Sequence, residues 1–189
     1  MIEPRRILIV GGPGTGKSHL ANKLGALLDV VPTDLRVLTR ELIGGPLPSY
    51  WRTTLAKDLA IESQWIAEGT FIGWTEPLME AADLIVWLDF PRLSALRSVV
   101  TNPLCIGLRR QPPTPGHMRF IRYLRWVNRY HRTPLSRAPD YGPHIEETRA
   151  LTDWVLRDFR HKVTVCHSKA GVAALIRSLA VAPLVFNRS

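Results

Sequence analysis

The residues most clearly suited to chemistry lie near the start of the chain, between positions 11 and 18. They read Gly-Gly-Pro-Gly-Thr-Gly-Lys-Ser, which matches the phosphate-binding pattern of glycine, any four residues, glycine, lysine, and serine or threonine. Glycines let the backbone curl so that consecutive N–H groups point inward at an anion. An apolar run from Ile7 to Val10 precedes the motif and a helical pattern follows it, so both flanks fit a phosphate-binding loop.

The positions of this loop have predicted roles in binding ATP and Mg²⁺. Lys17 is expected to reach the β and γ phosphates and to act in catalysis, and the Ser18 hydroxyl is expected to bind the metal ion. The predicted nucleotide-binding set comprises Gly11, Gly12, Gly14, Thr15, Gly16, Lys17, Ser18 and His19. The alternative is a glycine-rich turn between strand and helix that binds nothing, but the complete motif in this setting favours nucleotide binding.

Three carboxylates come directly after apolar runs, where parallel strands present residues to a ligand. Glu68 is predicted to hold the Mg²⁺ hydration shell, as part of the metal site, or to orient an acceptor hydroxyl in catalysis. Asp34 is predicted to accept a hydrogen bond from the hydroxyl of the acceptor substrate. Glu68 also fits an ordinary turn carboxylate, and Asp89 fits equally well as a residue leading into a helix that begins near Pro91.

Positive charge is concentrated in the middle of the chain. The net charge is +9, and the block between Phe90 and Pro139 contains ten arginines and no Asp or Glu, whereas the rest of the chain nets −1. Charges without local partners of opposite sign repel one another until an anion binds. Phosphate is the obvious anion for such a block.

Five of these arginines share one face of a helix predicted between Met118 and Arg132. They are Arg119, Arg122, Arg125, Arg129 and Arg132. This face fits a lid over the transferring phosphoryl group, a docking face for nucleic acid or another polyanion, or a merely solvated surface. The opposite face is aromatic and apolar, which favours core packing over the alternative of stacking on nucleic-acid bases.

The elements that must position these groups alternate along the chain. Short apolar runs predict strands at residues 7–10, 30–31, 65–67, 84–88 and 163–166. Apolar residues three to four apart predict helices at residues 17–28, 51–62, 77–82, 92–100, 118–131, 145–160 and 170–180. Short, fully apolar strands between helices indicate a parallel sheet covered on both faces, which is an α/β doubly wound domain.

Length and composition fit a single domain over residues 1–189. The irregular stretch at residues 102–116 contains four prolines and is long enough for a functional lid. No apolar stretch approaches the roughly 20 residues of a membrane helix, and no signal peptide precedes the first strand, so we expect a cytoplasmic protein without a membrane partner. Cys105 and Cys166 lack metal-ligand spacing and receive no role. The oligomeric state stays open.

The chain resembles the adenylate kinase-like group of P-loop nucleotide kinases over nearly its whole length. The likeness rests on the phosphate-binding loop, Asp34, the segments from Trp65 to Gly69 and from Leu84 to Pro91, and the arginine-rich block. Within that group the chain is most similar to the bacterial DNA topology modulation proteins, which carry a similar Trp-Ile-x-[Asp/Glu]-Gly and Leu-Asp-x-Pro-Arg. The resemblance implies a three-layer P-loop fold with a five-stranded parallel sheet of order 2-3-1-4-5.

The same resemblance implies how the chain divides its tasks. Residues 34–64 would form the acceptor-side segment, and residues 92–140 would form an arginine-rich lid. Arg137 and Arg149 would grip the transferring phosphate as catalytic residues, and Arg97 would lie over the nucleotide base. One departure concerns the acceptor, because adenylate kinases carry Gly-Phe-Pro-Arg where Gly69 is here followed by Thr-Phe-Ile. The missing arginine argues against AMP as the acceptor.

Two functions follow from these patterns. The first is a Mg²⁺-dependent kinase that transfers the γ-phosphoryl group of ATP to a small nucleoside-type or metabolite acceptor, by positioning and electrostatic stabilisation. The second is an ATP-binding regulatory protein that docks on nucleic acid through its arginine face. A GTPase is disfavoured, because the Asn22-Lys23 dipeptide lies inside the helix after the loop and is not followed by Asp at the required spacing.

Overall fold

The core of the protein is a five-stranded parallel sheet. A computed structural model describes residues 4–36, 49–70, 72–101, 116–135 and 147–181. The strands are β1 (Arg6–Gly11), β2 (Thr33–Asp34), β3 (Trp65–Gly69), β4 (Leu84–Leu88) and β5 (Val163–Cys166). They pair in the order β2-β3-β1-β4-β5, which confirms the order implied by the resemblance.

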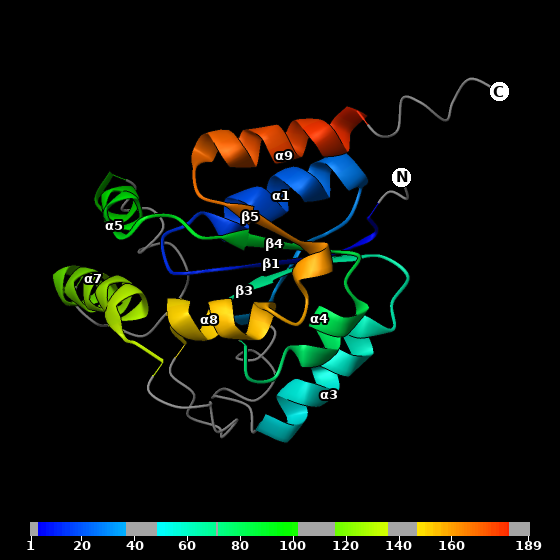
Figure 1. Ribbon diagram of the computed structural model, residues 1–189, viewed down its shortest axis with the longest axis horizontal. Helices are drawn as coiled ribbons and strands as arrows, with labels where there is room; N and C mark the ends of the chain where they lie inside the picture. Colours follow the sequence, from blue (N-terminus) through cyan, green and yellow to red (C-terminus); the bar gives the residue numbers. More distant parts are fainter. Residues whose placement is uncertain (1–3, 37–48, 71, 102–115, 136–146, 182–189) are drawn as a thin grey trace.

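Helices cover both faces of this sheet. The described α-helices are α1 (Lys17–Leu28), α3 (Ser49–Ala60), α4 (Glu76–Ala81), α5 (Arg92–Thr101), α7 (Gly116–Arg132), α8 (Arg149–Leu156) and α9 (Lys169–Val181). A short 3-10 helix at Arg160–Lys162 leads into β5. Figure 1 shows α1 and α9 on one face, α3, α4 and α8 on the other, and α5 and α7 beyond the carboxyl ends of the strands. The fold is therefore a three-layer α/β sandwich, as predicted.

The two faces of the sheet contribute to two separate hydrophobic cores. Ile7 and Ile9 of β1 pack with Leu24 of α1, whereas their neighbours Leu8 and Val10 join the core formed with α3, α4 and α8. All four strand residues are at most 1% exposed. Burial on both faces explains why the strand reads as a continuous apolar run and not as an alternating one. None of the described helices combines the length and apolar character needed to cross a bilayer.

The second strand was predicted at residues 30–31, but it lies three residues later in the chain. β2 is formed by Thr33–Asp34. The N–H of Val30 donates to the carbonyl of Gly25 at 2.9 Å, so this residue belongs to the end of α1. Val31 is 89% exposed. Two adjacent valines indicated a strand, but here the backbone of the first one completes the helix terminus.

The helix predicted at residues 145–160 is shorter than expected. α8 begins at Arg149, because the hydroxyl of Thr148 accepts a hydrogen bond from the N–H of Leu151 at 3.1 Å and caps the helix. It ends at Leu156, before the 3-10 helix. The other predicted helices and strands agree with the structure to within two residues at each end.

Candidate functional site

The segment between β1 and α1 forms a tight loop at the carboxyl edge of the sheet (Figure 1). Gly16 precedes α1 and has φ +88°, a left-handed conformation that side chains disfavour. The Thr15 hydroxyl donates to the carbonyl of Gly12 at 2.8 Å, and Lys17 Nζ donates to the same carbonyl at 2.9 Å. Both side chains thereby tie the start of α1 back to the loop, and the start of a helix is a common binding site for anions.

Two helices press directly against this loop. A Cβ atom built on Gly12 would lie 2.5 Å from a ring carbon of Tyr130 on α7, and one on Gly14 would lie 2.7 Å from Val99 on α5. Tyr130 is buried, and its hydroxyl lies 3.3 Å from the hydroxyl of Thr152 on α8. Burial raises the pKa of Tyr130 to about 12, so this hydroxyl keeps its proton at neutral pH.

Lys17 is the cation at the centre of the loop. Its side chain is buried, and burial lowers its pKa to about 8. The carboxylates of Glu68 and Glu147 oppose this shift, whereas the Arg36 guanidinium adds to it. A buried ammonium that has lost its hydration gains strongly from an incoming anion.

Glu68 is brought to the loop by strand pairing. β3 runs parallel to β1 with Glu68 opposite Ile9, so the carboxylate lies at the edge where the loop begins. The Ser18 hydroxyl donates to Glu68 Oε1 at 2.5 Å. The other carboxylate oxygen, Oε2, is buried and has no hydrogen-bond partner among the described residues. A buried carboxylate oxygen without a partner is costly and indicates a missing water or ion.

Ser18 and Glu68 fit a Mg²⁺ ion in their chemistry. This ion takes oxygen ligands and usually keeps several waters, with one or two protein carboxylates and substrate phosphates completing its shell. Within the described part of the chain, no three His, Cys, Asp or Glu side chains converge as metal ligands.

Asp34 lies beside Glu68 because β2 pairs with β3 in that register. Its carboxylate accepts hydrogen bonds from the Arg36 side chain at 3.2 and 3.3 Å and from the Arg36 backbone N–H at 3.0 Å. The same guanidinium lies 3.7 Å from Glu68 Oε1. Arg36 therefore links the two predicted carboxylates, a role that the sequence did not suggest.

A further carboxylate, Glu147, comes from the residues just before α8. It accepts a hydrogen bond from the hydroxyl of Thr70, which follows β3. Burial raises the pKa of Glu147, and the nearby charges of Lys17, Arg36 and Arg52 oppose that shift. Sequence reasoning assigned Glu147 no role, because it follows no strand and no motif marks it.

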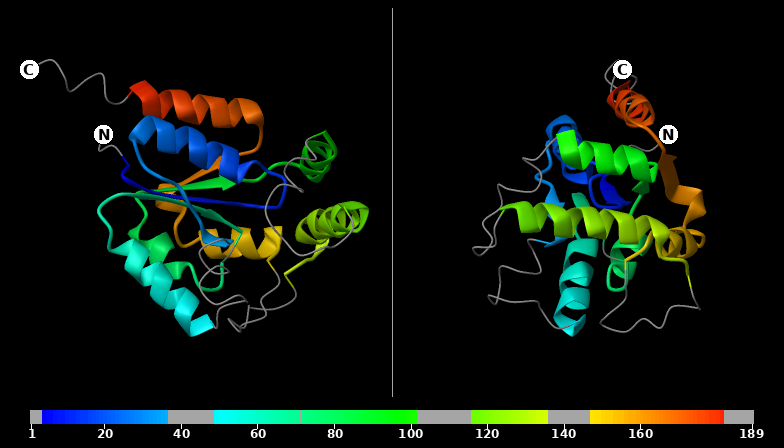
Figure 2. Two further views of the ribbon diagram at one scale, coloured as in Figure 1. Left: turned by 180° about the vertical axis from the view of Figure 1, so that it is seen from behind. Right: turned by 90° about the vertical axis from the view of Figure 1, so that its left-hand side faces the viewer.

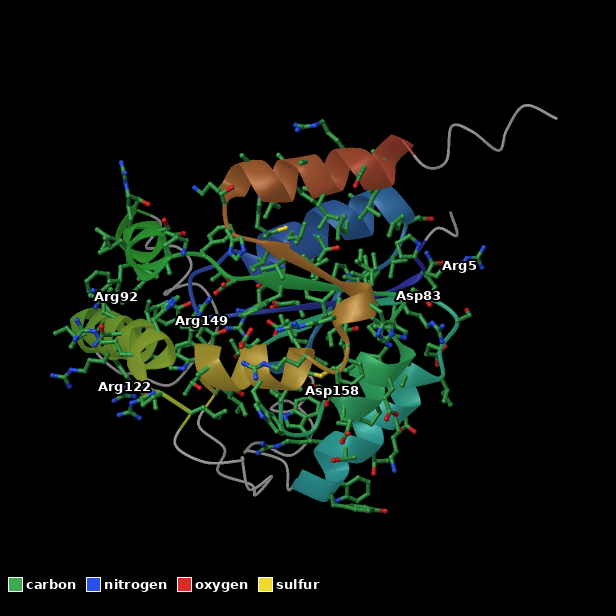
Figure 3. The ribbon with its side chains drawn as sticks, viewed as in Figure 1. Arg5, Asp83, Arg92, Arg122, Arg149 and Asp158 are labelled. Atoms are coloured by element: carbon green, nitrogen blue, oxygen red, sulfur yellow. The ribbon has the colours of Figure 1, made fainter. Side chains whose placement is uncertain are left out.

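Arg149 is the first residue of α8, and its side chain reaches the end of β4, where it forms a tight ion pair with Asp89. Its Nε and Nη2 atoms donate to the two carboxylate oxygens, both at 2.6 Å, and the guanidinium lies over the Trp87 ring at 5.7 Å from its centroid. His167 Nδ1 lies 3.2 Å from the Asp89 carbonyl oxygen. Figure 3 shows Arg149 between α7 and the strand ends.

The remaining predicted residues are spread around this region. His19 and Arg97 are exposed, on α1 and α5. Arg137 lies outside the described residues, as does Cys105. The structure thus brings Lys17, Ser18, Glu68 and Asp34 together, and the functional roles of all these residues stay predictions.

Comparison with known proteins gives the fold an independent reference. No protein-family model and no curated protein sequence matches the chain. A solved structure of shikimate kinase from Acinetobacter baumannii in complex with shikimate is similar, with a TM-score of 0.53 and 13% sequence identity, over 99% of this chain and 97% of that chain. Shikimate kinase from Bacteroides thetaiotaomicron is also similar, with a TM-score of 0.50 and 13% identity, over 97% of this chain and 99% of that chain.

These neighbours are P-loop kinases of the adenylate kinase-like fold. The predicted fold class is therefore confirmed, sheet order included. At 13% identity the similarity shows the fold alone. The substrate of this chain has to be inferred from its own residues.

Proposed function

We propose that this protein is a Mg²⁺-dependent kinase that transfers the γ-phosphoryl group of ATP to a hydroxyl group of a small molecule. One observation carries the proposal: Lys17, Ser18 and the buried, half-partnered carboxylate of Glu68 meet at the phosphate-binding loop. The carboxylate of Asp34 adjoins them on the next strand. A phosphate cradle, metal ligands and an acceptor-side carboxylate are the parts that phosphoryl transfer requires.

The loop side of the site binds ATP in this proposal. Backbone N–H groups of residues 11–18 and the Lys17 ammonium hold the β and γ phosphates. Ser18 binds the Mg²⁺ ion and Glu68 holds its hydration shell; the ion, when bound, neutralises charge on the phosphates. Positioning and charge stabilisation lower the barrier, because phosphoryl transfer needs little covalent help from the protein.

The acceptor side is formed around Asp34. The acceptor hydroxyl donates a hydrogen bond to the Asp34 carboxylate, which Arg36 holds in place. The acceptor oxygen forms a bond to the γ phosphorus, the bond from that phosphorus to the β–γ bridging oxygen breaks, and ADP leaves. The hydroxyl proton passes to Asp34.

Three arginines complete the proposed site. Arg137 and Arg149 bind the transferred phosphate, and Arg97 lies over the base, as the resemblance implies. Nε and Nη2 of Arg149 each give one N–H to Asp89, which leaves the N–H groups of Nη1 to donate to a phosphate oxygen.

The acceptor belongs to the class of small hydroxylated metabolites or nucleosides. The A. baumannii kinase was solved with shikimate, and its fold matches nearly the whole of this chain. Thr70 follows Gly69 where adenylate kinases begin the Phe-Pro-Arg segment, which disfavours AMP. The closer likeness to DNA topology modulation proteins rests on two short motifs and does not define the chemical class of the acceptor more closely.

The test is a transfer assay with γ-labelled ATP and Mg²⁺. The acceptor panel contains shikimate, nucleosides and small alcohols, and labelled product is separated from labelled free phosphate. We expect transfer to at least one acceptor at a rate above ATP hydrolysis. Hydrolysis alone across the whole panel would contradict a kinase.

Three variants separate binding from chemistry. Lys17→Ala should abolish binding of a fluorescent ATP analogue, whereas Lys23→Ala, on the exposed side of α1, should leave it unchanged. Asp34→Asn should keep ATP binding and slow transfer by about 10²-fold or more, as expected for loss of a proton acceptor. Equal loss of ATP binding in Asp34→Asn and Lys17→Ala would remove Asp34 from the acceptor side.

A further inference from the structure

The outer face of α7 carries a stripe of exposed arginines. Arg122, Arg125, Arg129 and Arg132 are exposed, and their spacing of three, four and three residues places them on one side of the helix. Ten residues of helix extend over about 15 Å. Figure 2 shows α7 crossing the molecule on the side of the strand carboxyl ends, and Figure 3 shows Arg122 at its outer edge. We call these four residues the arginine stripe.

The two helices that pack together here, α7 and α5, place no acidic residue beside the stripe. Neither α7 nor α5, which packs beside it, contains Asp or Glu. Within the described residues, Arg122, Arg125 and Arg132 form no ion pair. Arg92 of α5 adds a further positive charge and donates to Asn128 of α7 at 2.9 Å. Three of the four stripe arginines are therefore cations without an ion pair in the described part of the chain, a state that an external polyanion would stabilise.

The apolar face of α7 is already occupied. Val127 and Tyr130 are buried, and Val127 packs with Ala95 and Val99 of α5, joined by Phe120. A helix that binds a membrane surface inserts its apolar face among the lipid chains. Here that face is committed to the protein core, so the arginines project from a rigid support and a membrane is disfavoured as the partner.

We propose that the arginine stripe binds the phosphate backbone of nucleic acid. Arginine contacts phosphate through a planar fork of donors, and a row of arginines along one side of a helix complements the regular row of phosphates on a nucleic-acid backbone. Its length equals the rise of about four base pairs of duplex. Contacts of this kind fix position on the backbone and are independent of base sequence.

This surface is separate from the ATP site. Tyr130 contacts the phosphate-binding loop at Gly12 from the buried side of α7, whereas the stripe lies on the exposed side. The phosphate-binding loop and the stripe therefore lie on different sides of α7. The proposal consequently stands or falls independently of the kinase activity.

The test is fluorescence anisotropy of the full chain with a labelled 20-base-pair DNA duplex and a labelled single-stranded RNA, between 50 and 200 mM salt. Binding through three or four phosphate contacts predicts a slope of about −3 in a plot of log affinity against log salt for the duplex. The double variant Arg122→Gln/Arg125→Gln should reduce the magnitude of this slope by about 2 and weaken binding at least about tenfold at 100 mM salt.

A matched control removes the same charge elsewhere. Arg160→Gln/Arg177→Gln changes two exposed arginines on the 3-10 helix and α9 and should leave nucleic-acid affinity and slope unchanged. Both doubles should bind the fluorescent ATP analogue normally, and Lys17→Ala should still bind nucleic acid. If the stripe variant does not fold, Arg125→Gln alone should reduce the slope by about 1.

Three results would overturn the proposal. The first is a flat salt response or no binding of either probe at 50 mM salt. The second is equal loss in the stripe variant and its control, which would indicate net charge and not this surface. The third is binding to phosphatidylserine vesicles without binding to either nucleic acid.

Discussion

Two arginine–carboxylate pairs flank the phosphate-binding loop, and they are built differently. At the end of β4, Arg149 donates to both oxygens of Asp89 at 2.6 Å and lies over the Trp87 ring. At the end of β2, Arg36 reaches Asp34 at 3.2 and 3.3 Å and also lies 3.7 Å from Glu68. The Arg149 guanidinium pairs with one carboxylate, whereas the Arg36 guanidinium lies close to two.

This difference suggests different tasks for the two pairs: the Arg149–Asp89 pair supports the structure, whereas the bonds of the Arg36–Asp34 pair can rearrange when a ligand binds. Asp89 has a side chain only 4% exposed, so its charge depends on Arg149 for compensation. Arg36 is held by longer bonds, and Asp34 keeps a bond from the backbone N–H that needs no arginine side chain. A ligand arriving at the β2 side can therefore rearrange the existing bonds more cheaply than one arriving at the β4 side.

The largest expected effect is on stability at the tight pair. Arg149→Ala removes both charged bonds from the buried Asp89 carboxylate and leaves it 3.5 Å from His167 Nδ1. Removing one partner of a buried pair typically costs 3–5 kcal/mol, and because Arg149 is 46% exposed we expect the lower end, about 3 kcal/mol. Urea unfolding measures this loss.

The control for that measurement is an exposed ion pair on α8. Arg157 donates to Asp153 at 3.0 Å, and both side chains are largely exposed. Arg157→Ala should cost at most about 0.5 kcal/mol. If Arg149→Ala costs no more than this control, Asp89 does not depend on the pair and the contrast between the two sides disappears.

The next effect concerns pH and the lysine between the two pairs. Lys17 must be protonated to attract phosphate, and its pKa in the free protein is about 8. The affinity for ATP should therefore be constant below about pH 7 and fall as the pH rises through 8, by at most about tenfold per pH unit. Titration with a fluorescent ATP analogue between pH 6.5 and 9.5 measures this dependence.

Two variants assign that pH dependence to one side of the loop. The Arg36 guanidinium lowers the pKa of Lys17, so Arg36→Gln should move the midpoint upward. Arg149 is not among the groups that shift Lys17, so Arg149→Gln should leave the midpoint unchanged. Equal shifts in both variants would show that Lys17 does not distinguish the two pairs.

The smallest effect is on stability at the shared pair. Arg36→Ala removes two side-chain bonds to Asp34 and the 3.7 Å ion pair with Glu68, and it retains the backbone N–H bond to Asp34. We expect a loss of less than about 1 kcal/mol in the free energy of unfolding. A loss as large as that of Arg149→Ala would mean that both arginines are structural supports.

Much of the fold was predictable because its signals are local. The four longer strands are rich in apolar residues, uninterrupted in β4 and from Ile7 to Val10 of β1, and the motif fixes where β1 ends and α1 begins. The carboxylates Glu68 and Asp34 were found by one rule, that residues at the carboxyl ends of parallel strands face the ligand. The structure indeed places them side by side.

The rest depends on contacts between distant parts of the chain. Nothing near Arg149 in the sequence reveals that Asp89 holds it, and nothing near Glu147 reveals Thr70. β2 has two residues, too few for a periodic signal, and two valines just before it suggested the wrong position. Pairings of this kind become visible only when the sheet order and the loop paths are known.

The contact between Gly12 and Tyr130 has a consequence for exchanging parts of this protein. Position 12 is one that the phosphate-binding motif leaves open to any residue, yet a Cβ there would lie 2.5 Å from the tyrosine ring. A loop taken from another kinase would therefore collide with α7 unless it also carried glycine at this position. In this chain the phosphate-binding loop and α7 would have to be exchanged together. A larger residue at position 12 requires a smaller one at position 130.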